Sequence, residues 1–488
     1  MSNKTATYAK SVKKDVFSRS KFMRGTAVAG CSIVTLMAGS AKKIQMKLIK
    51  SIAAGVLLAL ISVTQALAGE SIRILTNVVG GKNVDEHALF INEVEKQIGL
   101  KVEMIKPTSN YDQVLLTTLA SGEKYDLIYG TAKQLDAFIS QGALMDLSGY
   151  IKESSILSDP VRIPQAEWNM IIRDGKHYSV PNKFEGGTMP TARGDWLKEF
   201  GMNAPNSLED WYAFFKMSKE KKGAWGLSTK GLNDIQAWMS AAGLKAGYVL
   251  NGKKRTIPYA SDAAAAIYDW FGKLSKEGLM DPDFPTNGSS AMRNKFLANQ
   301  VSTVTYWDAW VGLFNNLRLN DDPNTKFSAI GVGAVPGPNG KTILKRGDSS
   351  IWMIPANAEN PKNAIKFLEF WHSEKGYILG TLGIEGHDYT VNGGKFSMTK
   401  EGNSHGYDHG APRVTNSSWV NPFGSLPGVL EAQAIVMAQA SPEYLPKEWS
   451  TAKKIVNKYA LQAMTGVISG SEAVKKMQSE LSSAKLID

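Results

Sequence analysis

Residues 71–130 decide the fold, because short apolar strands and amphipathic helices alternate along them. The segments are SIRILT (71–76), DEHALFINEVEKQI (85–98), KVEMI (101–105), YDQVLLTTLA (111–120) and YDLIYG (125–130). The first, third and fifth have the length and apolar character of strands, and the other two carry apolar residues at helical spacing. Strands that alternate with helices predict a parallel α/β sheet in three layers. In such sheets ligands bind beyond the carboxyl ends of the strands.

The loops after the first and third strands are therefore candidate ligand-contacting segments. They span residues 77–82 and 130–133. Asn77 and Thr131 stand at these two strand ends, and Tyr111 opens the helix between them. Their position in the expected sheet makes all three candidates for ligand contact.

The remainder of the chain adds strands and helices in a less regular order. Strand-like sequence from residue 177 leads to a helix opened by RGDWL (193–197), and residues 200–300 are mostly helical. We expect strands at 301–305, 327–335 and 350–355, and helices at 361–374 and over most of the last hundred residues. The pattern shows neither internal repeats nor a long flexible linker. Several short crossings are therefore expected to join the parts of the fold.

Charge sets the first 68 residues apart from the rest. The 488-residue chain is 43% hydrophobic and 21% charged, has a net charge of +11, and is long enough for two or three domains. Residues 1–68 hold eleven Lys and Arg against one acid, which leaves 45 basic and 44 acidic residues in 69–488, a net charge of +1. The part that folds is nearly neutral, and this argues against nucleic acid as a partner.

Residues 46–68, MKLIKSIAAGVLLALISVTQALA, have the organisation of a cleaved secretory signal. A basic start and a short apolar stretch lead to Ala66 and Ala68, the small residues that precede a cleavage point. A retained N-terminal anchor is the alternative. Residues 1–45 form an upstream extension, which we interpret as a misassigned start. Cys31 is the only cysteine and lies in this extension. The exported part then has no disulfide or Cys-ligated zinc, which fits a periplasmic protein.

Five short motifs, in this order and spacing, make residues 69–488 resemble the family 1 extracellular solute-binding proteins of ABC transporters. The motifs are SVP (179–181), RGDWLKEFG (193–201), EGLMD (277–281), NPKNAIKF (360–367) and GIEGHDY (383–389). More narrowly, the sequence is similar to the oligosaccharide-binding branch that includes alginate-oligosaccharide binders. The resemblance implies a periplasmic-binding-protein-like fold of two α/β lobes, joined by hinge strands, with a ligand cleft between them.

The same resemblance implies where the lobes begin and end. Lobe 1 would comprise residues 69–182 and 334–385, and lobe 2 residues 183–333 and 386–488. The relatives that bind alginate carry an acidic, Asn-rich calcium loop where this chain has the basic stretch KEKKGAW (219–225), so we expect no calcium site. HGYDH (405–409) places two histidines in a glycine-containing loop without a third ligand. We therefore expect no metal site and no cofactor.

Aromatic rings beside polar side chains are the residues expected to bind a sugar, because sugars present flat C–H faces flanked by hydroxyl groups. The densest such group is YWDAW (306–310), directly after an expected strand. Tyr306, Trp307 and Asp308 are therefore the leading candidates. In the alternative interpretation, Trp310 belongs to the core and Asp308 only caps the following helix.

For several other residues, a role in ligand binding and a purely structural role are both considered. They are Phe184, Glu185, Arg193, Trp238, Glu385 and Tyr389. Phe184 and Glu185 follow the first expected crossing between lobes, and a solvated turn residue is the alternative for Glu185. The guanidinium of Arg193 could hydrogen-bond to a ligand; the alternative is a structural ion pair with Asp195. Three other tryptophans, at helical spacing, are expected in the core: Trp211, Trp270 and Trp371.

The sequence thus predicts a periplasmic solute-binding protein that captures a carbohydrate, specifically an oligosaccharide, by hinge closure and delivers it to an ABC importer. We expect a monomer that is not an enzyme and whose protein partner is the membrane permease. One alternative is a binding protein of the same fold for a non-sugar solute such as a polyamine, a phosphate ester or an iron chelate. The other is a secreted glycosidase with Glu185 and Asp308 as its carboxylate pair.

Overall fold

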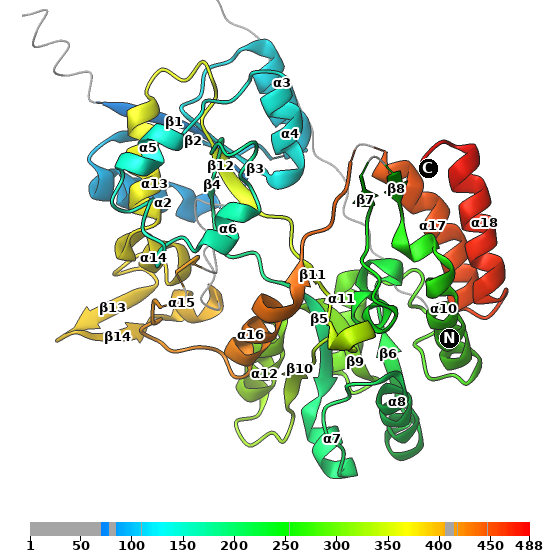
Figure 1. Ribbon diagram of the computed structural model, residues 1–488. Helices are drawn as coiled ribbons and strands as arrows, with labels where there is room; N and C mark the ends of the chain where they lie inside the picture. The colour runs from blue at the N-terminus through cyan, green and yellow to red at the C-terminus, as the bar shows by residue number, and fades with distance from the viewer. Residues whose placement is uncertain are drawn as a thin grey trace, which may run out of the picture. The chain divides into compact units, whose positions relative to one another are not determined.

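The computed structural model describes residues 70–77, 84–108, 110–252, 254–405, 414–416, 418–446 and 448–488. The expected signal segment, most of the loop at 77–82 and most of HGYDH lie outside the described residues. The described residues belong to one compact unit, Gly69–Asp488. This unit contains two mixed sheets, each with its own hydrophobic core, and we call each sheet with its helices a lobe (Figure 1).

The first lobe is built on the strand–helix alternation that the sequence predicts. Its elements are β1 (Ser71–Leu75), α2 (Val84–Ile98), β2 (Lys101–Ile105), α3 (Tyr111–Ser121), β3 (Leu127–Thr131), α4 (Ala132–Ser140), α5 (Ser148–Glu153), α6 (Gln165–Asn169), β4 (Val180–Pro181), β12 (Ser350–Met353), α13 (Pro361–Trp371), α14 (Glu374–Thr381), β13 (Tyr389–Asn392), β14 (Lys395–Met398) and α15 (Lys400–His405). The strand order of its sheet is β2-β1-β3-β12-β4.

Only part of this sheet is parallel. β2 and β3 run parallel to β1, as predicted, because each is reached through a helical crossover. β12 runs antiparallel to both β3 and β4. The expectation of a parallel sheet is therefore wrong for β12, which enters from the second lobe without a strand–helix–strand crossover. In Figure 1, α2 and α13 lie on one face of β1–β3, and α3 and α4 lie on the other.

The second lobe is the more helical of the two. Its elements are β5 (Gly187–Arg193), α7 (Gly194–Phe200), α8 (Leu208–Lys222), β6 (Trp225–Ser228), η1 (Gly231–Asp234), α9 (Gln236–Met239), η2 (Ser240–Ala242), β7 (Val249–Asn251), β8 (Lys254–Thr256), η3 (Pro258–Ala260), η4 (Asp262–Ala264), α10 (Ala265–Lys276), α11 (Ser289–Leu297), β9 (Val301–Trp307), α12 (Ala309–Asp321), β10 (Ala329–Gly331), η5 (Pro338–Gly340), β11 (Leu344–Arg346), α16 (Val429–Gln439), β15 (Ala440–Ser441), α17 (Trp449–Met464) and α18 (Gly470–Ser483). The strand order is β15-β11-β5-β9-β6, and β10 also pairs with β5.

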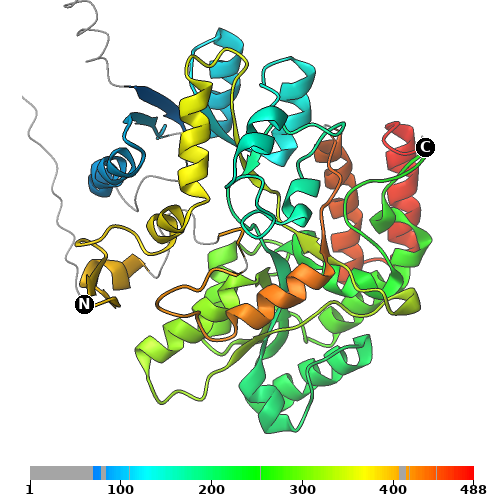
Figure 2. The same ribbon diagram turned by 60° about the vertical axis from the view of Figure 1, so that its left-hand side comes forward.

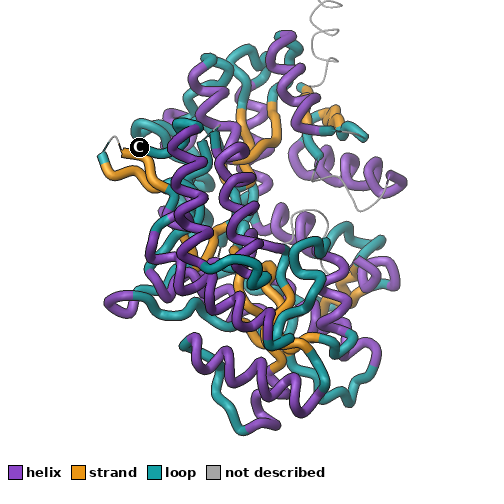
Figure 3. The backbone as a smooth tube through the Cα atoms, turned by 90° about the vertical axis from the view of Figure 1, so that its right-hand side faces the viewer, coloured by secondary structure: helices purple, strands orange, loops and turns teal. Residues whose placement is uncertain are grey.

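The faces of the second sheet are covered by different helices. α8, α9, α10, α17 and α18 contribute to its main core, and the long helices α17 and α18 run side by side (Figure 3). A smaller core lies between the sheet, α11 and α12, and α16 packs beside α12 (Figure 2). Trp211 is buried in this lobe, and Trp270 packs against its main core. Trp371 is buried in the core of the first lobe. The prediction that these three tryptophans are core residues is confirmed.

The chain crosses between the lobes at places other than those expected from the resemblance. The boundary at 334 is wrong, because β11 pairs with β5 in the second sheet and the crossing lies between Arg346 and Ser350. The boundary at 386 is also wrong. The Thr415 hydroxyl donates to the carbonyl of Arg162 in the first lobe at 2.6 Å, and the ring of Trp419 contacts that of Tyr377. The chain therefore returns to the second lobe only after Trp419.

Candidate functional site

Trp307 and Glu185, two of the predicted ligand residues, meet over a glycine at the crossing between the lobes. Trp307 is the last residue of β9 and is half-buried. A Cβ placed on Gly347 would lie 2.8 Å from Cζ3 of Trp307 and 3.0 Å from Cβ of Glu185. The absence of a side chain at residue 347 therefore lets the indole and the glutamate approach the same point from two segments of the second lobe.

Glu185 also connects this point to the first lobe. Its carboxylate accepts hydrogen bonds from the main-chain N–H of Ser350, at 3.3 Å, and from the Ser350 hydroxyl. Ser350 begins β12, and its side chain bonds to Tyr129 on β3. Burial raises the pKa of Tyr129 well above its usual value, and the charge of Glu185 raises it further. Glu185 is thus half-buried and hydrogen-bonded rather than a solvated turn residue.

An ion pair that the sequence did not suggest joins the lobes beside Glu185. Nη2 of Arg346, the last residue of β11, lies 2.7 and 2.9 Å from the two carboxylate oxygens of Glu167 on α6. The two side chains are 9% and 8% exposed. The guanidinium carbon lies 4.3 Å from the ring centroid of Phe184, which is itself buried. Burial raises the pKa of Glu167 more than the charge of Arg346 lowers it.

These residues define one group, which we call the lobe junction: Glu167, Phe184, Glu185, Trp307, Arg346, Gly347 and Ser350. It contains a half-buried aromatic ring, two carboxylates and a guanidinium, contributed by both lobes. Such a combination of a flat apolar ring with hydrogen-bonding side chains suits a polar solute that has apolar faces. The candidates Phe184, Glu185 and Trp307 lie here.

Asp308 holds the sheet together next to Trp307. Its side chain is fully buried, and Oδ1 lies 3.3 Å from the N–H of Gly187 at the start of β5. The N–H of Asp308 donates to the carbonyl of Gly187 at 3.0 Å. Asp308 occupies the N-cap position of α12 but makes no side-chain capping bond. It therefore follows neither of the two interpretations drawn from the sequence, since its carboxylate fastens β5 to β9.

Tyr306 points to the opposite face of the sheet from Trp307, because side chains alternate along a strand. Its hydroxyl accepts a hydrogen bond from Nη1 of Arg293 at 3.2 Å. The Arg293 guanidinium lies 3.7 Å from the ring centroid of Trp310, and both aromatic rings pack against the smaller core. The structural interpretation of Trp310 is therefore confirmed, and the structure separates Tyr306 from the lobe junction.

Arg193 and Trp238 are interior residues of the second lobe. Nε and Nη2 of Arg193 lie 2.8 and 2.6 Å from the Asp195 carboxylate, and the guanidinium lies 4.2 Å from the Trp196 ring centroid. Arg193 also donates to Asn299. The structural alternative for Arg193 is the one observed. Trp238 is fully buried, with its ring 5.6 Å from Trp211. A fully buried indole has no surface to offer a ligand, so the expectation for Trp238 does not fit this structure.

The strand-end candidates of the first lobe have mostly structural surroundings. The buried Tyr111 hydroxyl lies 2.8 and 3.0 Å from the carbonyl oxygens of Tyr129 and Leu75, where it ties β3 to β1. Thr131 is half-buried and opens α4, its N–H donating to Gln134 at 2.9 Å. Asn77 is exposed after β1. Tyr111 is thus accounted for by the fold, whereas Asn77 and Thr131 stay predictions.

Glu385 and Tyr389 lie with the first lobe. Glu385 is exposed and forms a main-chain bridge with Tyr389, whose buried ring stacks on Phe396 at 5.5 Å. Burial raises the pKa of Tyr389 to about 12, with the charges of Glu385 and of Glu93 on α2 adding to the effect. The role of Glu385 and Tyr389 as ligand residues stays a prediction.

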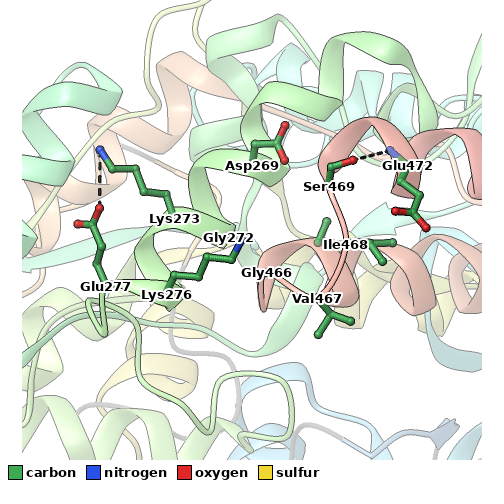
Figure 4. Close-up of a pocket in the computed structure, with 11 residues that line it drawn as sticks. Asp269, Gly272, Lys273, Lys276, Glu277, Gly466, Val467, Ile468, Ser469 and Glu472 are labelled. Atoms are coloured by element: carbon green, nitrogen blue, oxygen red, sulfur yellow. Dashed lines mark hydrogen bonds and ion pairs between the residues drawn. The ribbon is translucent and has the colours of Figure 1, made fainter.

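A separate hollow of about 500 Å³ lies in the second lobe, between α10 and the turn that joins α17 to α18 (Figure 4). Two of its polar side chains are paired within the lobe. Lys273 pairs with Glu277, and Oδ1 of Asp269 accepts from the N–H of Gly470 at 2.6 Å. None of the ligand residues predicted from the sequence lines it. The hollow is therefore a weaker candidate than the lobe junction.

Among the described residues, no three His, Cys, Asp or Glu side chains are arranged to hold a metal ion. No described helix is both long enough and apolar enough to cross a membrane. Residues 219–225, where relatives were expected to carry a calcium loop, form the end of α8, the Gly223 cap and the start of β6.

Comparison with known proteins agrees with this fold. Residues 90–379 match the model of the family described as bacterial extracellular solute-binding protein. Lipoprotein LipO of Bacillus subtilis (strain 168) is 24% identical over 370 residues, which cover 70% of this chain and 72% of LipO. The crystal structure of alginate-binding protein AlgQ2 without calcium ion has a TM-score of 0.63 at 18% identity and covers 86% of this chain and 95% of its own. The sugar-binding protein MalE from Xanthomonas citri has a TM-score of 0.63 at 17% identity. The match covers 85% of this chain and 98% of the MalE chain.

Proposed function

This chain belongs to the bacterial extracellular solute-binding proteins of ABC transporters, and we propose that its solute is a carbohydrate, specifically an oligosaccharide. The family and the fold are those of binding proteins rather than enzymes. The observation that carries the proposal is the meeting of Trp307 and Glu185 over Gly347, at a crossing between the lobes. An indole gives a sugar ring an apolar surface, and a neighbouring carboxylate accepts hydrogen bonds from its hydroxyl groups.

The sugar-binding and alginate-binding proteins of similar fold support this assignment. They share the architecture at less than 20% identity, so the choice of a sugar rests on the residues of the lobe junction. An amine would also suit a ring beside carboxylates. The charge of Arg346 is matched by that of Glu167, so an amine is the alternative that the test must distinguish from a sugar.

We propose hinge closure as the mechanism. A ligand that contacts Trp307 of the second lobe and the Glu185–Ser350 pair, which already spans the lobes, binds the closed arrangement more tightly than an open one. Such a ligand shifts the population towards closure by its difference in affinity for the two states. A permease that recognises the closed surface then receives the loaded protein. The signal-like segment 46–68 supports export of this monomer to the periplasm.

The test is thermal unfolding of purified residues 69–488 against neutral and acidic oligosaccharides, polyamines, phosphate esters and iron chelates. A ligand at one hundred times its Kd adds about 2.7 kcal/mol to the free energy of unfolding. For a chain of this size that raises the Tm by several degrees. A rise with oligosaccharides alone is the expected result. A rise only with amines, esters or chelates would contradict the sugar assignment, and release of shorter sugars on incubation would indicate a glycosidase.

A further inference from the structure

Asn182, the first residue of the crossing that follows β4, is anchored in the first lobe by all of its polar groups. Its main-chain N–H donates to the carbonyl of Ser350 at 2.9 Å, and its main-chain carbonyl accepts from the indole N–H of Trp371 at 3.1 Å. Its side-chain oxygen, Oδ1, accepts from the indole N–H of Trp352 at 2.8 Å. Its amide nitrogen, Nδ2, lies 3.3 Å from the Ser350 hydroxyl. The side chains of Asn182, Ser350 and Trp352 are all buried.

The indole of Trp352 determines the orientation of this asparagine. An indole N–H is a donor and never an acceptor, so it must face Oδ1 of Asn182. The NH2 group of Asn182 then faces Ser350 as a donor, and the Ser350 oxygen is the acceptor of this bond. A flipped amide would set two donors against each other at Trp352. The orientation is therefore fixed by the chemistry of the neighbours.

The hydroxyl of Ser350 consequently has one direction for its own hydrogen. A serine hydroxyl has one hydrogen to donate and two lone pairs with which to accept. One lone pair accepts from Asn182. The Tyr129 side chain, which keeps its proton because burial raises its pKa, bonds to the same hydroxyl. The hydrogen of Ser350 is thus directed to Oε1 of Glu185, which also accepts from the Ser350 main-chain N–H at 3.3 Å.

Both hydrogen bonds of Glu185 end on the same one of its two oxygens. Among the described residues, the other oxygen, Oε2, has no hydrogen-bond partner. Glu185 is half-buried, and its side chain meets that of Trp307 over Gly347. Two donors on Oε1 suit a carboxylate rather than a carboxylic acid. Oε2 therefore offers lone pairs to the solute and no hydrogen.

We infer that Asn182 and Ser350 are positioning residues that fix Glu185 as a hydrogen-bond acceptor, so that the solute must present a free hydroxyl group beside the sugar ring on Trp307. This inference rests on the proposed function and adds a chemical requirement at one position of the oligosaccharide. A sugar whose hydroxyl is missing or methylated at that position has no hydrogen to donate. Oε2 would then lose its water without gaining a partner.

The first experiment compares sugars that differ in one hydroxyl group. The probe is the tightest-binding oligosaccharide of the unfolding panel, whose neutral members are maltotriose, cellotriose and mannotriose. Calorimetry compares its affinity for residues 69–488 with the affinities of its mono-O-methyl and monodeoxy derivatives. At one position, both derivatives should bind about tenfold more weakly than the parent sugar.

Glu185→Gln separates a donor requirement from a simple loss of contact, because Ser350 also orients the new amide. The amide oxygen would face the two donors of Ser350, and the NH2 group would replace Oε2 as a donor. The mono-O-methyl derivative keeps an ether oxygen that accepts from this NH2 group, whereas the monodeoxy derivative has no oxygen there. The variant should therefore bind the parent sugar and the methyl ether within about threefold of each other and still reject the deoxy sugar.

Two variants test the positioning residues themselves. Ser350→Ala removes the hydroxyl that connects Asn182 to Glu185, so the preference for the parent sugar over its methyl ether should fall from about tenfold to about threefold. Asn182→Asp turns the donor that faces Ser350 into an acceptor and draws the Ser350 hydrogen away from Glu185. The preference should fall in the same way, and Ser350→Ala decides the matter if this buried charge prevents folding.

Ser349→Ala is the matched control for Ser350→Ala. Ser349 is the preceding residue and is also buried, but its hydroxyl has no hydrogen-bond partner among the described residues. The control removes the same atom from the same crossing without breaking a hydrogen bond. It should leave both the affinity and the preference for the parent sugar unchanged.

The outcomes separate this inference from the proposed function. If the methyl ethers at every position bind wild type like the parent sugar, the inference is overturned and the proposed function stays intact. The same holds if Glu185→Gln and Ser350→Ala reject the methyl ether as strongly as wild type does. If no oligosaccharide of the panel binds, the proposed function fails and the inference fails with it.

Discussion

Two arginines of this molecule have almost the same immediate surroundings, but one forms an ion pair within a lobe and the other forms an ion pair between the lobes. Arg193 and Arg346 are each paired with a carboxylate, largely shielded from solvent and stacked on an aromatic ring. The partner of Arg193, Asp195, lies two residues away in the same lobe. The partner of Arg346, Glu167, lies 179 residues away in the other lobe.

The difference shows how one chemical motif serves two purposes. The Arg193 pair is enclosed by Trp196 and Phe327 and can lose its partner only if the second lobe unfolds. The Arg346 pair can separate when the lobes move apart, with each lobe still folded. Breaking the first pair should therefore cost stability, and breaking the second should mainly change the balance between open and closed arrangements.

The largest expected effect is that of Arg193→Ala. It leaves Asp195 without its cation and removes the group stacked between two rings, so the free energy of unfolding of the second lobe should fall by about 4 kcal/mol. Urea unfolding followed by tryptophan fluorescence measures this change. The affinity of the protein that remains folded should be unaltered. A loss of affinity with unchanged stability would instead make Arg193 a ligand residue.

Asp234 extends the comparison of Asp195 and Glu167 to a third carboxylate, on which the nearby positive charges are those of lysines rather than an arginine. Burial raises its pKa to about 7 from 3.8, so between these values the folded protein holds a proton that the unfolded chain releases. Its contribution to stability is thus fully present below about pH 4 and is lost as the pH rises to about 7.

Asp234→Asn should remove this dependence. Relative to the wild type, the variant should gain on the order of 3 kcal/mol between pH 4 and pH 8. Urea unfolding at pH 4, 6 and 8 provides the measurement. Parallel stability curves for the two proteins would mean that Asp234 titrates like an exposed carboxylate.

Trp307→Ala tests the ligand side of the lobe junction. Loss of an aromatic platform should weaken binding of the best oligosaccharide by about 2 kcal/mol, the middle of the range known for ring stacking on bases. Trp270→Phe, in α10 of the main core, is the matched aromatic control and should leave the affinity unchanged. If Trp307→Ala lowers the Tm but leaves the affinity unchanged, Trp307 has only a structural role in the core.

Glu167→Gln should have the smallest effect on stability. Arg346 is able to regain water when the lobes separate, so the free energy of unfolding should fall by only about 1 kcal/mol. Small-angle scattering of the ligand-free variant should show a larger radius of gyration than the wild type. A stability loss as large as that of Arg193→Ala would show that the two pairs are equivalent after all.

Local chemistry explains what could be predicted from the sequence. β1, α2, β2 and α3 follow from strand and helix periodicity alone, and the Arg193–Asp195 pair was among the alternatives because its partners are two residues apart. Glu185 was expected near a crossing and Trp307 after a strand, but their meeting over Gly347 was not foreseen. Each of the predicted features depends on neighbours in the sequence or on a rule for one sheet.

Contacts between distant segments account for what could not be predicted. β11 is three residues long and carries no periodic signal, so neither its place in the second sheet nor Arg346 was foreseen. Asp308 and Trp238 combine the chemistry of ligand residues with full burial, which only the pairing with Gly187 and Trp211 reveals. Tyr111 similarly lies at a strand end, but its hydroxyl is used by the carbonyls of β1 and β3.

The place of β12 in the first sheet has a consequence for how the chain acquires its structure. β4 pairs with β12, and β12 is made only after the strands β5 to β11 of the other sheet. During synthesis or after export, β1 to β3 can associate early, but β4 must wait for a partner about 170 residues later, and such long closures are slow. The second sheet faces the same delay at β15. Neither lobe can therefore finish before the other has begun, and a cut between them in the gene would yield two incomplete sheets rather than two domains.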